Sequence, residues 1–219
     1  MFVAFSNGSS FEFAVELTSS FLQGSGWSTF DSNPRFCYDV NGDKLADLVG
    51  FANDGVYVQF STGSSFSPAV LLLSDLSSNY GWTSFNQTPR CLAHVTNLNQ
   101  PNLGADILAF NSSGVYLSNY NNGVFGTPTL ILPGLYGSSQ FPVIACVDMD
   151  GDGLTDIIGF GSSTLITYSQ VGGGYGPTNA LVQETSGQFT TAAPYNTKVN
   201  FKIILLIIIF IQGGRKNSK

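Results

Sequence analysis

Charged residues are scarce in this sequence, and histidine and cysteine are scarcer still. Only 10% of the 219 residues are charged, against about 25% in an ordinary globular domain. The chain holds one histidine, three cysteines and no Gly-x-Ser-x-Gly nucleophile elbow. Because the sequence also shows no open metal site with a candidate base, and because its carboxylates are assigned to cation loops described below, we expect a protein that is not an enzyme.

Basic residues are rare and unevenly placed. Residues 1–197 contain only three of the eight lysines and arginines but all fourteen acidic residues, which gives this stretch a formal net charge of −11. Binding to nucleic-acid phosphates needs the opposite sign. We therefore exclude nucleic acid as a partner, and we note that the other five cations all lie in residues 198–219.

The residues that are abundant indicate an all-β fold. The chain is 43% hydrophobic and 13% aromatic, which excludes a disordered chain. Gly, Ser, Asn, Thr, Phe and Tyr dominate, whereas the helix formers Lys, Glu and Ala are few. This composition is typical of short strands joined by tight turns.

The sequence repeats with a period of about 55 residues, which is typical of propellers and their relatives. A shift of 55 places residues 5–11 on 60–66, and a shift of 109 places residues 39–51 on 148–160. The second copy carries a four-residue insertion. In the first period, β-branched and aromatic runs predict strands at 34–40, 46–52, 55–61 and 67–73.

Four strands and a linker are the size of one β-propeller blade. We expect antiparallel blades at 34–73, 89–132 and 142–183, preceded by a half-blade at 2–18 that matches only the last two strands of a unit. The predicted domain is thus a partial propeller of about 3.5 blades within residues 1–197, fewer than the four to eight blades of a closed ring. Open strand edges make self-association an expected interaction.

Two nine-residue loops, 39–47 and 148–156, have the most specific chemistry. They place oxygen side chains at positions 1, 3, 5 and 9 and a backbone carbonyl at position 7, and Ca²⁺ prefers six to eight such hard oxygen ligands. The predicted ligands of two Ca²⁺ sites are Asp39, Asn41, Asp43, Leu45 and Asp47 in the first loop, and Asp148, Asp150, Asp152, Leu154 and Asp156 in the second.

These loops differ from an EF-hand, because position 12 is glycine and a β-branched strand follows. The alternative is an acidic hairpin turn that binds nothing.

The corresponding loop of the second copy has lost the pattern. His94 stands at the position of the first aspartate, and Asn97, Asn99 and Asn102 are neutral, so that Asp106 is the single acid. We expect no tight Ca²⁺ binding here and read His94 as a substituted loop residue.

Residues 39–51 followed by Gly-Val-Tyr-Val at 55–58 resemble the FG-GAP or VCBS repeat of integrin α-chain heads and many secreted propellers. In this chain a tryptophan, Trp27 or Trp82, precedes a Pro-Arg pair. The version of the repeat with this feature is most similar to that of the fungal seven-bladed lectins that bind N-acetylglucosamine. The resemblance covers about residues 2–197 and implies calcium-binding blades. Both tryptophans are candidate sugar-stacking residues, although a wedge between neighbouring blades is our preferred interpretation.

The favoured function is a non-catalytic, calcium-binding recognition module, lectin-like or adhesive, whose partner is a glycan or a cell-surface protein. The alternative is a structural propeller fragment of a larger secreted protein or enzyme with no ligand of its own. Saturable, sugar-competed binding distinguishes the two.

The three cysteines are expected to be unpaired core residues. Cys37 and Cys146 occupy the same repeat position, and Cys91 lies one place away from it. Equivalent positions in separate blades should be too far apart for a disulfide.

The segment 198–219, apolar and then basic, is expected to lie outside the propeller. Its longest apolar run, 203–211, has nine residues, against roughly twenty needed to span a bilayer. A membrane is a partner only if residues 199–212 form an anchor. No secretory leader is visible at Met1, but loops suited to millimolar Ca²⁺ favour secretion of the full-length parent.

Overall fold

The computed structural model describes residues 1–95, 104–133, 143–149, 151, 153–160, 164–167, 169–170, 174–175 and 180–182. In these ranges the regular elements are β-strands and two 3-10 helices, η1 (Gln23–Ser25) and η2 (Ser78–Tyr80). Every strand pair is antiparallel. The all-β, antiparallel prediction is confirmed.

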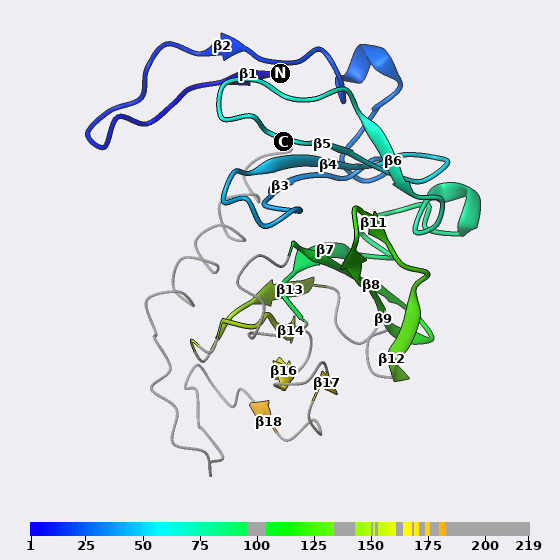
Figure 1. The fold of residues 1–219 in the computed structure, drawn as a ribbon. Helices are drawn as coiled ribbons and strands as arrows, with labels where there is room; N and C mark the ends of the chain where they lie inside the picture. Colours follow the sequence, from blue (N-terminus) through cyan, green and yellow to red (C-terminus); the bar gives the residue numbers. More distant parts are fainter. Residues whose placement is uncertain are drawn as a thin grey trace, which may run out of the picture.

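Three four-stranded sheets follow one another along the chain (Figure 1). The first sheet comprises β3 (Arg35–Tyr38), β4 (Asp47–Phe51), β5 (Val56–Gln59) and β6 (Val70–Leu73). The second comprises β7 (Arg90–Ala93), β8 (Asp106–Asn111), β9 (Gly114–Ser118) and β12 (Thr129–Pro133). The third comprises β13 (Val143–Val147), β14 (Asp156–Phe160), β15 (Thr164–Thr167) and β18 (Ala180–Val182).

In each sheet the strands lie in chain order, so that the first strand of the unit is at one edge and the fourth at the other. Small hairpins join the third and fourth strands of the later sheets: β10 (Tyr120–Asn121) with β11 (Val124–Phe125), and β16 (Ser169–Gln170) with β17 (Gly174–Tyr175).

The chain begins with a separate hairpin of β1 (Phe2–Val3) and β2 (Val15–Glu16), which lies beside the first sheet in Figure 1. A β-bridge between Ser6 and Phe11 closes its turn, as the bridge between Ser61 and Phe66 does in the first sheet. The hairpin therefore repeats the outer half of a sheet.

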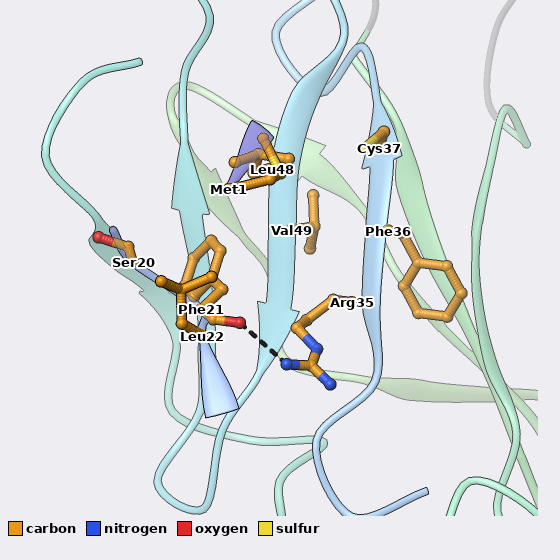
Figure 2. Close-up of a pocket in the computed structure, with 9 residues that line it drawn as sticks. All are labelled: Met1, Ser20, Phe21, Leu22, Arg35, Phe36, Cys37, Leu48 and Val49. Atoms are coloured by element: carbon orange, nitrogen blue, oxygen red, sulfur yellow. Dashed lines mark hydrogen bonds between the residues drawn. The ribbon is translucent and has the colours of Figure 1, made fainter. Parts of the chain in front are cut away.

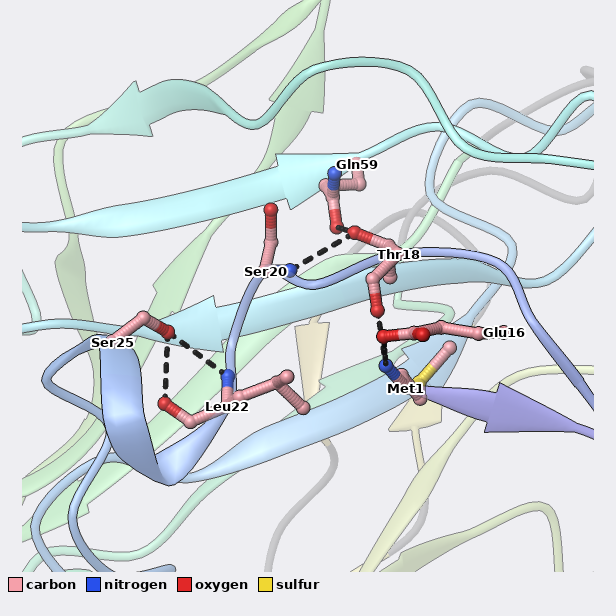
Figure 3. A network of polar contacts seen from close by, with 7 residues as sticks. All are labelled: Met1, Glu16, Thr18, Ser20, Leu22, Ser25 and Gln59. Atoms are coloured by element: carbon pink, nitrogen blue, oxygen red, sulfur yellow. Dashed lines mark hydrogen bonds and ion pairs between the residues drawn. The ribbon is translucent and has the colours of Figure 1, made fainter.

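Polar contacts attach this hairpin to the first sheet (Figure 3). The N-terminal ammonium donates to the carbonyl of Thr18 and lies 4.0 Å from a carboxylate oxygen of Glu16. The Thr18 hydroxyl donates to the side-chain oxygen of Gln59 in β5 at 3.1 Å and accepts from the backbone N–H of Ser20. Gln59 is buried, so its side-chain oxygen cannot bond to water, and the Thr18 hydroxyl supplies a hydrogen bond in place of water.

Apolar cores fill the spaces between consecutive sheets. The core between the first and second sheets includes Val49, Phe51 and Val58 from one side and Leu92 and Ile107 from the other. The alternation of side chains along each strand explains how the sheets are covered on both faces, because neighbouring residues point to opposite faces. A second core joins the second and third sheets.

The cysteine prediction was wrong. Cys91 in β7 and Cys146 in β13 form a disulfide, with their Cα atoms 6.5 Å apart, and Cys37 is free and exposed. The two first strands lie next to each other, so the distance between sheets is short at this edge. The one-residue offset of Cys91 also turns its side chain toward the next sheet, because adjacent residues of a strand face opposite ways.

In the part of the chain that the structure describes, no helix is long and apolar enough to cross a membrane. The segment 198–219, on which the anchor hypothesis rests, lies outside the described residues.

Candidate functional site

The first acidic loop is organised around Asp39. Its carboxylate accepts backbone N–H bonds from Gly42 at 2.7 Å, Asp43 at 3.1 Å and Lys44 at 2.7 Å. Gly42 and Lys44 have φ angles of 79° and 71°, the left-handed turns that allow three successive N–H groups to point at one carboxylate. The side chains of Asn41 and Asp43 are joined by a 2.9 Å hydrogen bond at the loop tip.

The last aspartate of the loop clamps it onto the sheet. Asp47 is fully buried and accepts from the backbone N–H of Val40 at 2.9 Å and of Ser61 at 2.8 Å. Burial raises the pKa of the Asp47 carboxyl, and the nearby Asp43 and Asp39 raise it further, although the two N–H bonds act in the opposite direction.

The same clamp recurs in the other two sheets. Asp106 accepts from the backbone N–H of Tyr120 at 2.9 Å, and Asp156 accepts from that of Met149 at 2.8 Å. Both aspartates are buried. Sequence analysis assigned position 9 to metal binding and missed this role, although the persistence of Asp106 in a loop without other acids was a signal for it.

The donor chemistry of residues 39–47 suits a hard cation, because all the candidate ligands are oxygens. In the described conformation, however, both oxygens of Asp39 serve the loop backbone. Among the described residues no three Asp, Glu, His or Cys side chains converge on one centre. A bound ion would have to draw Asp39 and Asp43 inward, so the two calcium sites stay a prediction.

The third loop is built in the same way where it is described. Asp148 accepts from the N–H groups of Gly151 at 2.7 Å and Gly153 at 3.0 Å, and both glycines have positive φ angles of 81° and 88°. Its predicted ligands Asp150 and Asp152 lie outside the described residues. The Leu154 side chain is buried in the loop.

In the second copy, His94 connects two sheets through its backbone. Its N–H donates to the hydroxyl of Thr155 at 2.9 Å, and its carbonyl accepts from the Thr155 N–H at 2.7 Å. The neutral residues Asn97, Asn99 and Asn102 lie outside the described part of the chain.

An arginine bracket holds each linker, and sequence analysis gave these arginines no role. Arg35 donates to the carbonyls of Phe21 at 2.9 Å and Trp27 at 3.3 Å. Arg90 donates in the same way to Leu76 at 3.0 Å and to Trp82 at 3.2 Å.

The first carbonyl in each bracket belongs to a residue in the left-handed region. Phe21 has φ 58° and Leu76 has φ 54°, a conformation that is costly for a bulky side chain. The arginine therefore fixes the turn by which the chain leaves one unit and enters the next.

The two linker tryptophans are packing residues in this structure. Trp82 is 6% exposed and meets Tyr116 of the second sheet edge-on, with ring centroids 5.9 Å apart. Trp27 is half-buried, and its ring lies so close to Gly50 of β4 that a Cβ there would come within 2.5 Å of it. These positions fit the wedge interpretation, and sugar stacking by either residue stays a prediction.

An apolar pocket of about 230 Å³ lies between the N-terminal hairpin and the first sheet (Figure 2). β3 and β4 form its wall, Met1 approaches from the hairpin, and the Arg35 side chain reaches across toward the carbonyl of Phe21. The residues that line it are Met1, Ser20, Phe21, Leu22, Arg35, Phe36, Cys37, Leu48 and Val49.

Comparison with solved structures gives an informative neighbour. No protein-family model matches the sequence, and no curated protein matches it either. A solved lectin of Agrocybe aegerita, described as recognising non-reducing terminal N-acetylglucosamine, is similar with a TM-score of 0.69 and 31% sequence identity. The match covers 80% of this chain but only 44% of the lectin, so this chain spans less than half of the lectin's length.

Proposed function

We propose that this protein is a lectin-like recognition module for glycans that end in N-acetylglucosamine. The similarity to the Agrocybe aegerita lectin carries the proposal, because 31% identity over four-fifths of the chain goes beyond a shared fold. A lectin binds without catalysis, which agrees with a chain that has a single histidine.

We further propose that each four-stranded sheet is one propeller blade. Three features support this: the chain order of strands within each sheet, the apolar cores between consecutive sheets, and the repeated arginine bracket between units. In such an array the recognition surface is formed by loops that rigid sheets hold in place.

Calcium is proposed as a stabiliser of the loops 39–47 and 148–156. Each of these loops has at least three acidic residues within nine positions, and the mutual repulsion of carboxylates so close in sequence favours binding of a divalent cation. Two features support an extracellular location. Disulfides such as Cys91–Cys146 persist in oxidising compartments, and loops of this kind suit the millimolar Ca²⁺ concentration outside the cell.

The direct test is calorimetric titration of the protein, in millimolar calcium, with an oligosaccharide that ends in N-acetylglucosamine. We expect saturable binding that free N-acetylglucosamine competes away. The matched control is the same oligosaccharide ending in galactose, which should not bind. Equal binding of both sugars would contradict the specificity for N-acetylglucosamine. Binding of neither would contradict the proposal and favour a structural propeller with no ligand of its own.

A further inference from the structure

The N-terminal hairpin corresponds to the outer half of the first sheet. A shift of 55 residues places the cross-strand pair Val3–Val15 on Val58–Val70, so β1 and β2 have the register of β5 and β6. In the first sheet, β5 also pairs with β4 on its other edge. Among the described residues β1 pairs with β2 alone, so its second edge is open.

The face of the first sheet beside that edge is less covered than the matching face of the second sheet. Arg90 is 1% exposed, and its guanidinium lies 5.2 Å from the ring centroid of Phe51, which belongs to β4 of the preceding sheet. Arg35 makes the same bracket but is only half-buried. The strand that would cover Arg35 is the β4 equivalent of the hairpin's own unit, on the open edge of β1.

The positions of the cysteines point to the same uncovered face of the first sheet. Cys146 pairs across β13 with Ile157, and Cys37 pairs across β3 with Leu48, so the two occupy one position of the repeat and face the preceding unit. Cys146 meets Cys91 there. Cys37 faces the pocket beside the hairpin and has no disulfide partner among the described residues.

In the first and second units, the residue before the Cys37 position of the first strand points toward the next unit. Cys91 pairs with Leu108 and Phe36 pairs with Val49, the same position of the repeat. Phe36 packs against the core shared with the second sheet. A first strand placed in the pocket would therefore turn its Phe36 equivalent toward Cys37.

We propose that the pocket between β1 and β3–β4 is a docking site for a two-stranded antiparallel β segment that has the sequence type of residues 34–51. The segment adds its second strand to the open edge of β1, places its first strand beside β3, and lays its Phe51 equivalent over Arg35. The pocket is apolar, and the strand edge supplies backbone hydrogen bonds, which are the two requirements of β-strand addition.

The test uses a synthetic peptide of residues 34–52 of this chain with the substitutions F36C and C37S, its thiol activated as a mixed disulfide, and the full-length protein. The Cys37 thiolate attacks the mixed disulfide of the docked peptide, which forms the protein–peptide disulfide and releases the activating thiol. Docking raises the local concentration of that mixed disulfide to the millimolar range. Ten-micromolar peptide should therefore react with Cys37 about 100-fold faster than an unstructured mixed disulfide of the same reactivity. The matched control is the unsubstituted peptide, likewise activated, whose own Cys37 would face away from the protein's Cys37.

A second measurement does not depend on thiol chemistry. Hydrogen exchange at the amide of Phe2, whose N–H faces the open edge of β1, should slow when a cysteine-free peptide (C37S) is added, and the F51A form of that peptide should protect it less. A C37S protein should give no cross-link but the same protection.

Equal cross-linking rates for the two activated peptides, together with unchanged exchange at β1, would overturn the proposal. So would a Cys37 that reacts with neither peptide in the full-length chain. A Cys37–Cys37 dimer that excludes the peptides would assign the pocket to a second copy instead.

Discussion

The boundary between the first and second sheets and the boundary between the hairpin and the first sheet have the same parts but differ in burial. Each has an arginine that donates to two linker carbonyls, a residue in the left-handed region and a tryptophan. At the inter-sheet boundary Arg90 and Trp82 are buried, whereas Arg35 and Trp27 are half-buried.

The difference separates local geometry from stabilisation. The arginine bracket forms at both boundaries, so the linker sequence itself specifies it. Complete burial occurs only where the first two strands of the preceding unit are present, because Phe51 then covers the guanidinium. The neighbouring sheet, rather than the linker, therefore sets how much each boundary contributes to the free energy of unfolding.

The largest expected effect distinguishes the two arginines. Arg90→Ala should lower the free energy of unfolding by about 3–5 kcal/mol, because it leaves two buried carbonyls unpaired and a cavity under Phe51. Arg35→Ala should cost only about 1 kcal/mol, since the Arg35 side chain is only half-buried. Urea unfolding followed by circular dichroism measures both, and equal losses would refute the role assigned to burial.

Breaking the disulfide tests the boundary between the second and third sheets. Its loop spans 55 residues, so replacing Cys91 and Cys146 by serine should lower the free energy of unfolding by about 4 kcal/mol in the chain-entropy account. Cys37→Ser is the matched control and should change it by less than about 0.5 kcal/mol. A control loss as large as that of the double variant would mean that Cys37 also has a partner.

Calcium should distinguish the loops of the first and second sheets. At a hundred times the dissociation constant, each occupied site adds about 2.7 kcal/mol to the free energy of unfolding. Asp39→Asn with Asp43→Asn should remove the contribution of the first loop. The charge-matched control is Asp54→Asn with Glu12→Gln, two exposed residues outside the loop, and it should preserve this contribution. Identical melting of the protein in calcium and in EDTA would refute both predicted calcium sites, in loops 39–47 and 148–156.

The smallest expected effect comes from Asp47. Burial raises its pKa in the folded state above the ordinary value of 3.8, so the folded protein binds more protons than the unfolded chain between the two values. In EDTA, stability should therefore fall as pH rises through this window, by at most about 1.4 kcal/mol per pH unit.

The variant Asp47→Asn should lower stability overall, because an amide cannot accept both N–H bonds. It should also flatten this pH dependence, which urea midpoints measured in buffers from about pH 4 to 7 would show. An unchanged slope would assign the titration to another carboxylate.

The sequence repeat made the strands and turns predictable. The disulfide and the buried aspartate clamps could not be predicted from it. The run 46–52 predicted β4 because a short apolar stretch, Leu48–Phe51, lies between turn residues and has few alternatives. The disulfide was missed because equivalent positions were compared, whereas the one-residue offset of Cys91 decides which face its side chain occupies. The buried clamp by Asp47 and Asp156 was missed because a carboxylate in an acidic loop is more readily interpreted as a ligand.

Side chains of the first strands also meet in a fixed order across the boundaries between units. Phe36 and Leu92 share one boundary, and Cys91 and Cys146 share the next. An extra copy of the second or third unit inserted between these two units would bring one more cysteine, so that one of the three would have no partner. The disulfide therefore forms without a leftover thiol only when these two units follow each other directly.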